Sequence, residues 1–126
     1  MNRLVLDAGA FVAFERGDAR LRARLTAARR LGIELVTTSP VVGQVWRDGR
    51  RQALVARLIA ATRVDAPSEQ SARRAGELLA ATKTKDVVDA LLVERVTHGD
   101  TVLTSDPDDL ERLLAAARVR ATVATV

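Results

Sequence analysis

Leu4-Val5-Leu6-Asp7, near the start of the chain, is the stretch that decides the fold. Three consecutive apolar residues closed by a carboxylate are typical of a short strand that is buried on both faces. Outward from this stretch, further β-branched and apolar runs predict strands at 33–37 and 101–104. A short strand at Val64 and an edge strand within 121–126 complete the set.

Helical stretches separate these strands. They are expected at 10–15, 20–30, 41–48, 51–62, from Ser68 or Ser71 to 81, at 86–98, and from Pro107 to about 117. Strands and helices that alternate with short connections predict an α/β fold with a mainly parallel sheet. Right-handed crossovers would then place helices on both faces of the sheet. A length of 126 residues fits a single domain that spans the whole chain, 1–126.

Composition excludes several classes of protein. The chain has no cysteine, so it has no disulfide framework and no thiolate metal site. No uninterrupted apolar run reaches about 18 residues, and the N-terminal apolar run is too short for a signal peptide. We therefore expect a cytoplasmic protein without a membrane-spanning helix.

Charge and aromatic content bear on the partner. The net charge of +4 is compatible with a polyanion, and all but Lys83 and Lys85 of the 20 basic residues are arginine. Heavy arginine use equally reflects a GC-rich genome. The three aromatic residues, Phe11, Phe14 and Trp46, are too few for a protein that stacks bases on an aromatic platform.

Acidic residues follow the predicted strands at one edge of the sheet. Asp7 comes directly after the first strand, and Asp106 follows the strand at 101–104. Asp86 and Asp89 share a face at the start of a helix that points to the same edge. In parallel sheets, the ligand crevice lies at the carboxyl ends of the strands.

Each acid also has a purely structural interpretation. Asp7 and Asp106 suit the N-cap of the helix that follows, and Asp86 and Asp89 suit a first turn. The nearby pair Asp108 and Asp109 is interpreted as first-turn acids. The coincidence of several acids at one edge favours a site.

Clustered carboxylates repel one another unless a cation lies between them. Only hard oxygen ligands are available here, and these suit Mg²⁺ or Mn²⁺ rather than zinc. Such an ion polarises a phosphoryl oxygen and activates water. The residues therefore predict a metal-dependent phosphodiesterase.

Three blocks of the sequence resemble the signature blocks of the PIN domain, in the family's order. They are Leu-Asp-Ala-Gly-Ala-Phe-Val-Ala (6–13), Val-Val-Asp-Ala-Leu-Leu-Val (87–93) and Val-Leu-Thr-Ser-Asp-Pro-Asp-Asp-Leu (102–110). The resemblance is strongest to the single-domain VapC type of bacterial toxin–antitoxin modules and covers nearly the whole chain. It implies a PIN-like three-layer α/β/α sandwich and a Mg²⁺- or Mn²⁺-dependent endoribonuclease acting on RNA. It further implies a homodimer and inhibition by a VapB-type antitoxin.

Carried over by position, the resemblance makes Asp7, Asp89 and Asp106 the catalytic and metal-binding acids. Asp86 is an additional candidate ligand. The family's second acid is usually a glutamate, and Gln44 stands in its place. Glutamine offers a carbonyl oxygen without a charge, which lowers the expected metal affinity.

Four further residues are candidates with alternative structural roles. Glu15 would replace the missing carboxylate or be an exposed acid at a helix end. Thr104 and Ser105 would hold a metal-bound water or a phosphate, or be turn hydroxyls. Arg47, three residues beyond Gln44, would contact the scissile phosphate or pair with an acid.

Two other functions compete with a ribonuclease. A signalling receiver domain has a similar length and design, but it needs paired acids after the first strand and a lysine after a late one. Asp7 is instead followed by Ala8-Gly9, and neither lysine follows a late strand. A degenerate PIN domain that binds antitoxin or RNA without cleaving it is the second alternative, and Gln44 motivates it.

Overall fold

The computed structural model describes residues 2–126, and it contains a five-stranded sheet and seven helices. The strands are β1 (Leu4–Leu6), β2 (Leu35–Thr38), β3 (Arg63–Asp65), β4 (Thr101–Thr104) and β5 (Thr122–Thr125). The helices are α1 (Ala8–Glu15), α2 (Ala19–Arg30), α3 (Ser39–Val45), α4 (Ala53–Ala60), α5 (Glu69–Thr82), α6 (Val87–Val93) and α7 (Pro107–Ala117). The predicted alternation of strands and helices is confirmed, including the short strand at Val64 and the C-terminal edge strand.

The sheet has the strand order β3-β2-β1-β4-β5, and every neighbouring pair is parallel. The chain builds from β1 outward to β2 and β3, then crosses back to β4 and continues to β5. The direction of winding therefore reverses between β1 and β4. In sheets of this kind, the crevice outside the carboxyl ends of the two strands at the reversal is the usual ligand site.

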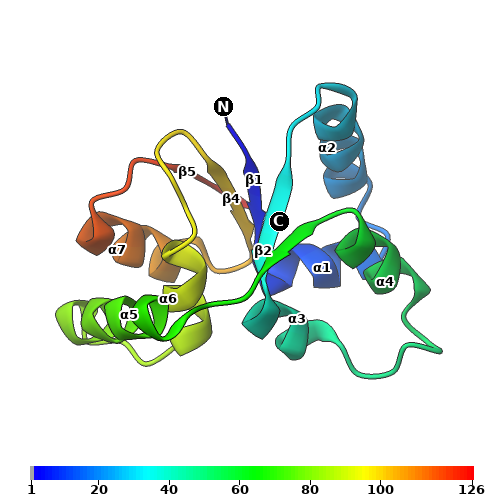
Figure 1. The fold of residues 1–126 in the computed structure, drawn as a ribbon. Helices are drawn as coiled ribbons and strands as arrows, with labels where there is room; N and C mark the ends of the chain where they lie inside the picture. Colours follow the sequence, from blue (N-terminus) through cyan, green and yellow to red (C-terminus); the bar gives the residue numbers. More distant parts are fainter. Residues whose placement is uncertain (1) are drawn as a thin grey trace.

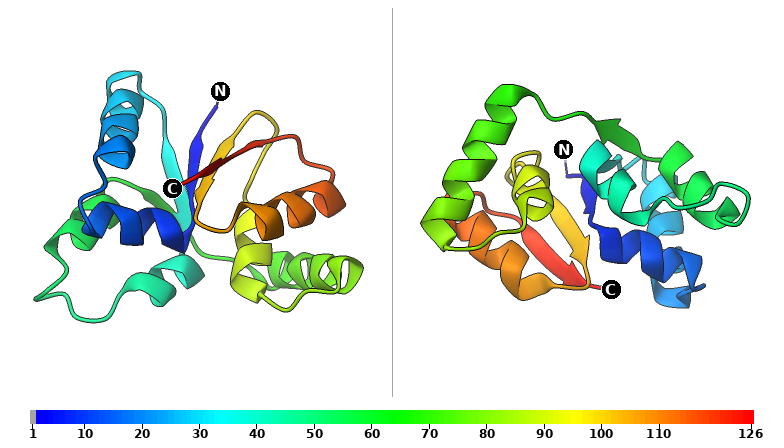
Figure 2. Two further views of the ribbon diagram at one scale, coloured as in Figure 1. Left: turned by 180° about the vertical axis from the view of Figure 1, so that it is seen from behind. Right: turned by 90° about the horizontal axis from the view of Figure 1, so that it is seen from below.

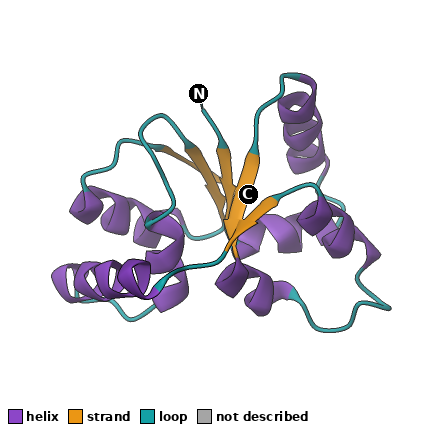
Figure 3. Cartoon of the chain, viewed as in Figure 1, coloured by secondary structure: helices purple, strands orange, loops and turns teal. Residues whose placement is uncertain are grey.

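The helices form two layers, one on each face of the sheet, as Figures 1 and 3 show. Helices α1 to α4 belong to one group, in which α1 packs against the other three, while α5, α6 and α7 pack together in the other. At the carboxyl edge of the strands, α3 also packs against α6 across the two layers. Figure 2 shows this edge from below, with α1 and α3 on one side and α6 and α7 on the other.

The core is apolar and lies on both faces of the central strands. The largest fully buried side chains include Leu6, Phe11, Leu92, Leu103 and Leu110, which come from strands and helices of both layers. Burying a side chain of this size stabilises the fold by about 1.5–3 kcal/mol. Among residues 2–126, no helix is both long and apolar enough to cross a membrane.

Helix α3 begins and ends earlier than the sequence predicted. Thr38 rather than Ser39 is its N-cap, and its hydroxyl accepts the Val41 N–H. The helix stops at Val45 because the side chain of Gln52 binds the main chain there. The Gln52 amide nitrogen donates to the Val45 carbonyl at 2.8 Å.

Helix α6 is five residues shorter at its C-terminal end than the predicted helix, which ran to 98. Two residues outside the predicted helix, Arg3 and Asp100, bind backbone groups that would otherwise continue it. The Arg95 carbonyl accepts a hydrogen bond from the Arg3 guanidinium at 2.7 Å, and the Thr97 N–H donates to Asp100 at 2.8 Å. No pattern within 86–98 announces these partners.

Asp100 is fully buried at the amino end of β4, where it holds three segments together. It accepts hydrogen bonds from the Arg3 main chain and guanidinium, at 3.2 and 2.9 Å, and from the Thr97 N–H and hydroxyl. Burial opposes ionisation of Asp100, but the hydrogen bonds from Arg3 and Thr97 outweigh burial and hold its pKa below the ordinary value. The pair therefore fixes β1 beside the turn that leads into β4.

We predict that Asp100→Asn destabilises the protein by about 3 kcal/mol, because it leaves the Arg3 guanidinium half-buried and without its counter-charge. Urea denaturation of the wild type and the variant measures the change. Glu69→Gln is the matched control, since it removes the acid of an exposed ion pair with Arg73 on α5 and should have little effect. Equal losses in the two variants would contradict the structural role given to Asp100.

Candidate metal centre

The parallel register of β1 and β4 builds the site. Leu6 is paired with Leu103, so Asp7 and Thr104, the next residue of each strand, come to lie opposite each other. The Asp7 N–H donates to the Leu103 carbonyl at 3.0 Å, which continues the pairing by one residue. Asp7 therefore stands at the carboxyl edge, at the point where the winding of the sheet reverses.

The Asp7 carboxylate is buried and held on both oxygens. Oδ1 accepts the N–H of Ala8, which makes Asp7 the N-cap of α1, and Oδ2 accepts the Thr104 hydroxyl, both at 2.7 Å. The same Thr104 oxygen accepts the N–H of Asp106 at 3.0 Å. Thr104 thus links the Asp7 carboxylate to the backbone of Asp106.

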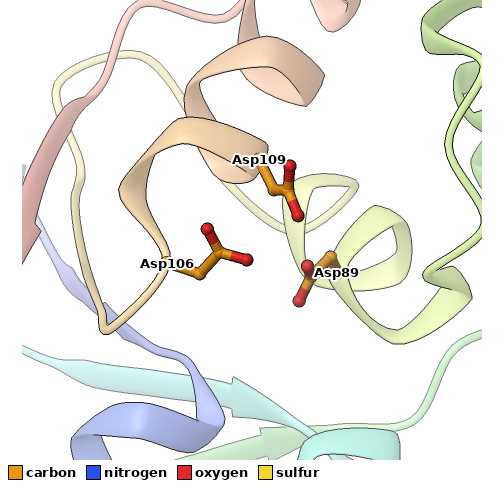
Figure 4. A group of neighbouring side chains, drawn as sticks. All are labelled: Asp89, Asp106 and Asp109. Carbon is orange, nitrogen blue, oxygen red and sulfur yellow. The ribbon is translucent and has the colours of Figure 1, made fainter.

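Three carboxylates meet beside this link. Asp89 on α6, together with Asp106 and Asp109 at the start of α7, offers one oxygen each within 4.8 Å of one another. Figure 4 shows the three side chains pointing toward one another from the two helices. Two oxygen ligands of one Mg²⁺ lie at most about 4.2 Å apart, so small side-chain rotations would bring all three into its reach.

Asp89 is the most perturbed of these groups. Burial raises the pKa of its carboxyl to about 7, and the nearby negative charge of Asp7 adds to the rise. The other contributing charges are those of Asp86, Asp106 and Asp109. A cation bound at the cluster would remove this repulsion, so the donor set fits a hard divalent metal ion.

Asp106 sits at the N-cap position of α7 but makes no capping hydrogen bond with its side chain. Its pKa is raised, chiefly by a side-chain hydrogen bond with the Asp109 carboxyl. The Asp106 carboxyl therefore faces that of Asp109, within the cluster.

The interpretation of Asp109 as a simple first-turn acid misses its place in this group. Asp109 lies three residues after Asp106, a spacing that brings both side chains to the same side of the first turn. That spacing was visible in the sequence. Asp108, by contrast, is exposed and outside the cluster.

The remaining candidates lie around the cluster in different ways. Asp86 is the exposed N-cap of α6, and its carboxylate accepts the Asp89 N–H at 3.1 Å. Ser105 is exposed, and its main chain and hydroxyl press so closely on Gly9 that a Cβ there would come within 2.4 Å of Oγ. Glu15 is exposed at the last turn of α1.

Within residues 2–126, neither Gln44 nor Arg47 makes a hydrogen bond or an ion pair with an acidic side chain. Gln44 is exposed, one residue before the end of α3. The Arg47 guanidinium donates to the main-chain carbonyls of Gly43 and Trp46, at 3.0 and 2.7 Å. Helix α3 itself carries no carboxylate.

The sequence matches no family model and no curated protein. Among solved structures, the chain is similar to one in the crystal structure of VapBC2 from Rickettsia felis bound to a DNA fragment from its promoter, with a TM-score of 0.71 and 11% identity over 96% of this chain and 98% of that one. It is also similar to a chain of DNA-bound VapBC from Salmonella typhimurium, with a TM-score of 0.70 and 17% identity over 98% of both chains. The PIN-like α/β/α fold predicted from the sequence is thus confirmed, and the fold is the one found in VapBC complexes.

The raised pKa of Asp89 predicts a pH dependence of stability. Between its ordinary value of 3.8 and about 7, the folded protein holds a proton that the unfolded chain has lost. The free energy of unfolding therefore falls as pH rises through this window and levels off above it. In EDTA, Asp89→Asn should remove this loss, so that the variant gains ~5 °C in Tm over the wild type on going from about pH 5 to about pH 8.

Thermal unfolding at the two pH values, with Asp108→Asn as the control for a change of one exposed charge, measures the difference. A pH profile of Asp89→Asn that is parallel to that of the wild type would show that Asp89 is not the buried acid described.

Proposed function

We propose that this protein is a metal-dependent endoribonuclease of the VapC type, the toxin component of a toxin–antitoxin pair. One observation carries the proposal: the carboxylates of Asp89, Asp106 and Asp109 meet at the carboxyl edge of the sheet, near enough to Asp7 for its charge to raise the pKa of Asp89. The likeness of the fold to chains of VapBC complexes supports it.

Mg²⁺ or Mn²⁺ is the proposed cofactor, and the ion would be held by Asp89, Asp106 and Asp109, with Asp7 beside them. When bound, it would supply Lewis-acid polarisation of a phosphoryl oxygen and an activated water. The chain's own residues fix the positions of the ligands. Thr104 holds the Asp7 carboxylate and the Asp106 backbone, and the Asp86 cap holds the first turn of α6.

The partners follow from the same proposal. The neighbouring structures are VapBC complexes, which supports a VapB-type antitoxin as partner. A groove of about 300 Å³ between α2 and α4 has an apolar floor and suits an apolar, acidic segment of such a protein, because three arginines line it. These arginines are Arg22, Arg29 and Arg57.

A homodimer, which the resemblance implies, is also proposed. Exposed apolar side chains outside the groove support it, since a further apolar contact would cover them. The most exposed are Leu31 and Val87.

Gln44 favours a second candidate function, a PIN-like protein that binds antitoxin or RNA without cleaving it. Helix α3 carries no carboxylate where the family usually has a glutamate, so the metal would meet one negative charge fewer. The two candidate functions differ in whether RNA is cut.

Cleavage of a pool of cellular RNAs with Mg²⁺ or Mn²⁺ tests the proposal. We expect wild-type protein to cleave and Asp7→Asn to lose about a hundredfold or more in rate, because the variant keeps the size of the side chain but removes the charge beside the metal. Asp108→Asn is the control, because it removes an exposed acid of α7 that is not part of the cluster, and it should cleave like the wild type. RNA that stays intact while the protein still binds metal would favour the non-cleaving alternative.

Gln44→Glu tests the place given to Gln44. The added charge should strengthen Mn²⁺ binding and enlarge the Mn²⁺-induced rise in Tm, while like-charge repulsion slightly lowers the Tm in EDTA. Gln70→Glu makes the same change on the exposed surface of α5 and should leave the Mn²⁺ effect unaltered. If the two variants respond alike, Gln44 does not line the metal site.

A further inference from the structure

Trp46 is the aromatic residue that the fold leaves open. Phe11 is fully buried, and Phe14 is half-buried with the Arg22 guanidinium 5.5 Å from the centre of its ring. Trp46, at the C-cap of α3, is 38% exposed. The chain has no other tryptophan and no tyrosine, so Trp46 is the most exposed of its three aromatic residues.

The segment that carries Trp46 is held in one shape although it has no regular structure. The Gln52 side chain accepts the N–H groups of Arg47 and Asp48, at 2.6 and 2.9 Å, and donates to the Val45 carbonyl at 2.8 Å. Three backbone groups of the turn are thus satisfied by one side chain. A binding residue that is fixed in advance loses little conformational entropy when a ligand arrives.

Glycine at position 49 supports the indole from one side. A Cβ on Gly49 would lie 2.8 Å from Cζ2 and 3.4 Å from Cη2 of Trp46, so only glycine lets the main chain come this close to the six-membered ring. The ring rests on the turn there, and 38% of the residue stays exposed.

Exposed positive charge follows the open ring along the chain. Arg47, Arg50 and Arg51 follow it within five residues and are all exposed. Asp48 is the single acid among them and lies 3.3 Å from the Arg50 guanidinium. One ring is not an aromatic platform, but a single open ring with arginines close by in the chain can bind single-stranded nucleic acid by stacking one base while guanidinium groups contact phosphates.

The turn follows a helix that begins at the edge where the acids gather. Helix α3 starts directly after β2 at the carboxyl edge and packs against α1 and α6, the helices that follow Asp7 and carry Asp89. Its seven residues are about 10 Å long. Trp46 is therefore one short helix away from that edge. The turn that leads from α3 toward α4 lies at the lower side of the molecule in Figure 1.

We propose that Trp46 stacks on an unpaired base of the RNA substrate, a few nucleotides from the bond placed at the acidic cluster, and that Arg50 and Arg51 contact the adjoining phosphates. This inference rests on the proposed ribonuclease function and names a determinant of its substrate choice. A lone indole offers a protein partner little apolar area. The exposed arginines that follow it complement the charge of phosphates, which favours RNA as the ligand.

Trp46 supplies its own signal. As the only tryptophan, its emission reports on this turn alone. The test is a titration of the 126-residue chain, in EDTA so that no cleavage occurs, with a single-stranded RNA of about ten nucleotides. Trp46 emission should be quenched and should saturate at the same RNA concentration as the anisotropy of an end-labelled copy of that RNA.

Variants separate stacking from folding. Trp46→Leu should weaken RNA binding about tenfold, while Trp46→Phe, which keeps an aromatic face, retains most of the affinity. Val64→Ala, which trims an apolar residue on β3 that is about as exposed as Trp46, should not change it. Arg50→Gln with Arg51→Gln should flatten the dependence of affinity on salt. Circular dichroism confirms that each variant is folded.

The outcomes distinguish this inference from the proposed function. RNA that binds by anisotropy without a change in Trp46 emission overturns the inference and leaves the nuclease proposal intact. An emission change with antitoxin but none with RNA, or no RNA binding at all, also overturns it. Quenching by RNA in a protein that fails the cleavage test would support the Trp46 contact and reject the nuclease.

Discussion

The hydrogen bond from the Thr104 hydroxyl to Asp7 Oδ2 joins the two strands between which the winding of the sheet reverses. It is buried, it lies directly beyond the last paired residues of β1 and β4, and its oxygen also accepts the N–H of Asp106. One hydroxyl therefore holds the Asp7 carboxylate in place and also binds the backbone at the turn that leads into α7. The acidic cluster depends on this geometry, because α7 supplies two of its carboxylates.

Bringing these carboxylates together works against the stability of the metal-free fold. The pKa of Asp89 reflects this, since burial and four neighbouring acids raise it to about 7. The contrasting case lies at the amino end of β4, where Asp100 is buried beside Arg3 and its pKa is lowered. A buried acid with a guanidinium partner fixes the fold, whereas a buried acid among other acids is left to bind a cation.

The two ends of α3 serve different parts of the proposed site. Its first turn lies at the carboxyl edge, next to the acids, and its last residue leads into a turn that the Gln52 side chain holds rigid. If Trp46 binds a base there, substrate choice and catalysis would lie on one continuous surface with different chemistry at each end. The loss of a carboxylate at position 44 would then fall between them, on the exposed surface of the same helix.

The sequence by itself determined the alternation of strands and helices, the parallel sheet, and the placement of Asp7 and Asp106 at strand ends, because these follow from local patterns of apolar residues and from the rules of parallel connection. It did not determine where α3 and α6 end, because the side chains of Gln52, Arg3 and Asp100 decide this by binding main-chain groups that only the folded chain brings to them. Nor did it place Asp109 in the cluster. A first-turn acid has the same local pattern whether its carboxylate faces solvent or another carboxylate, and only the packing of α7 against α6 settles which one it meets.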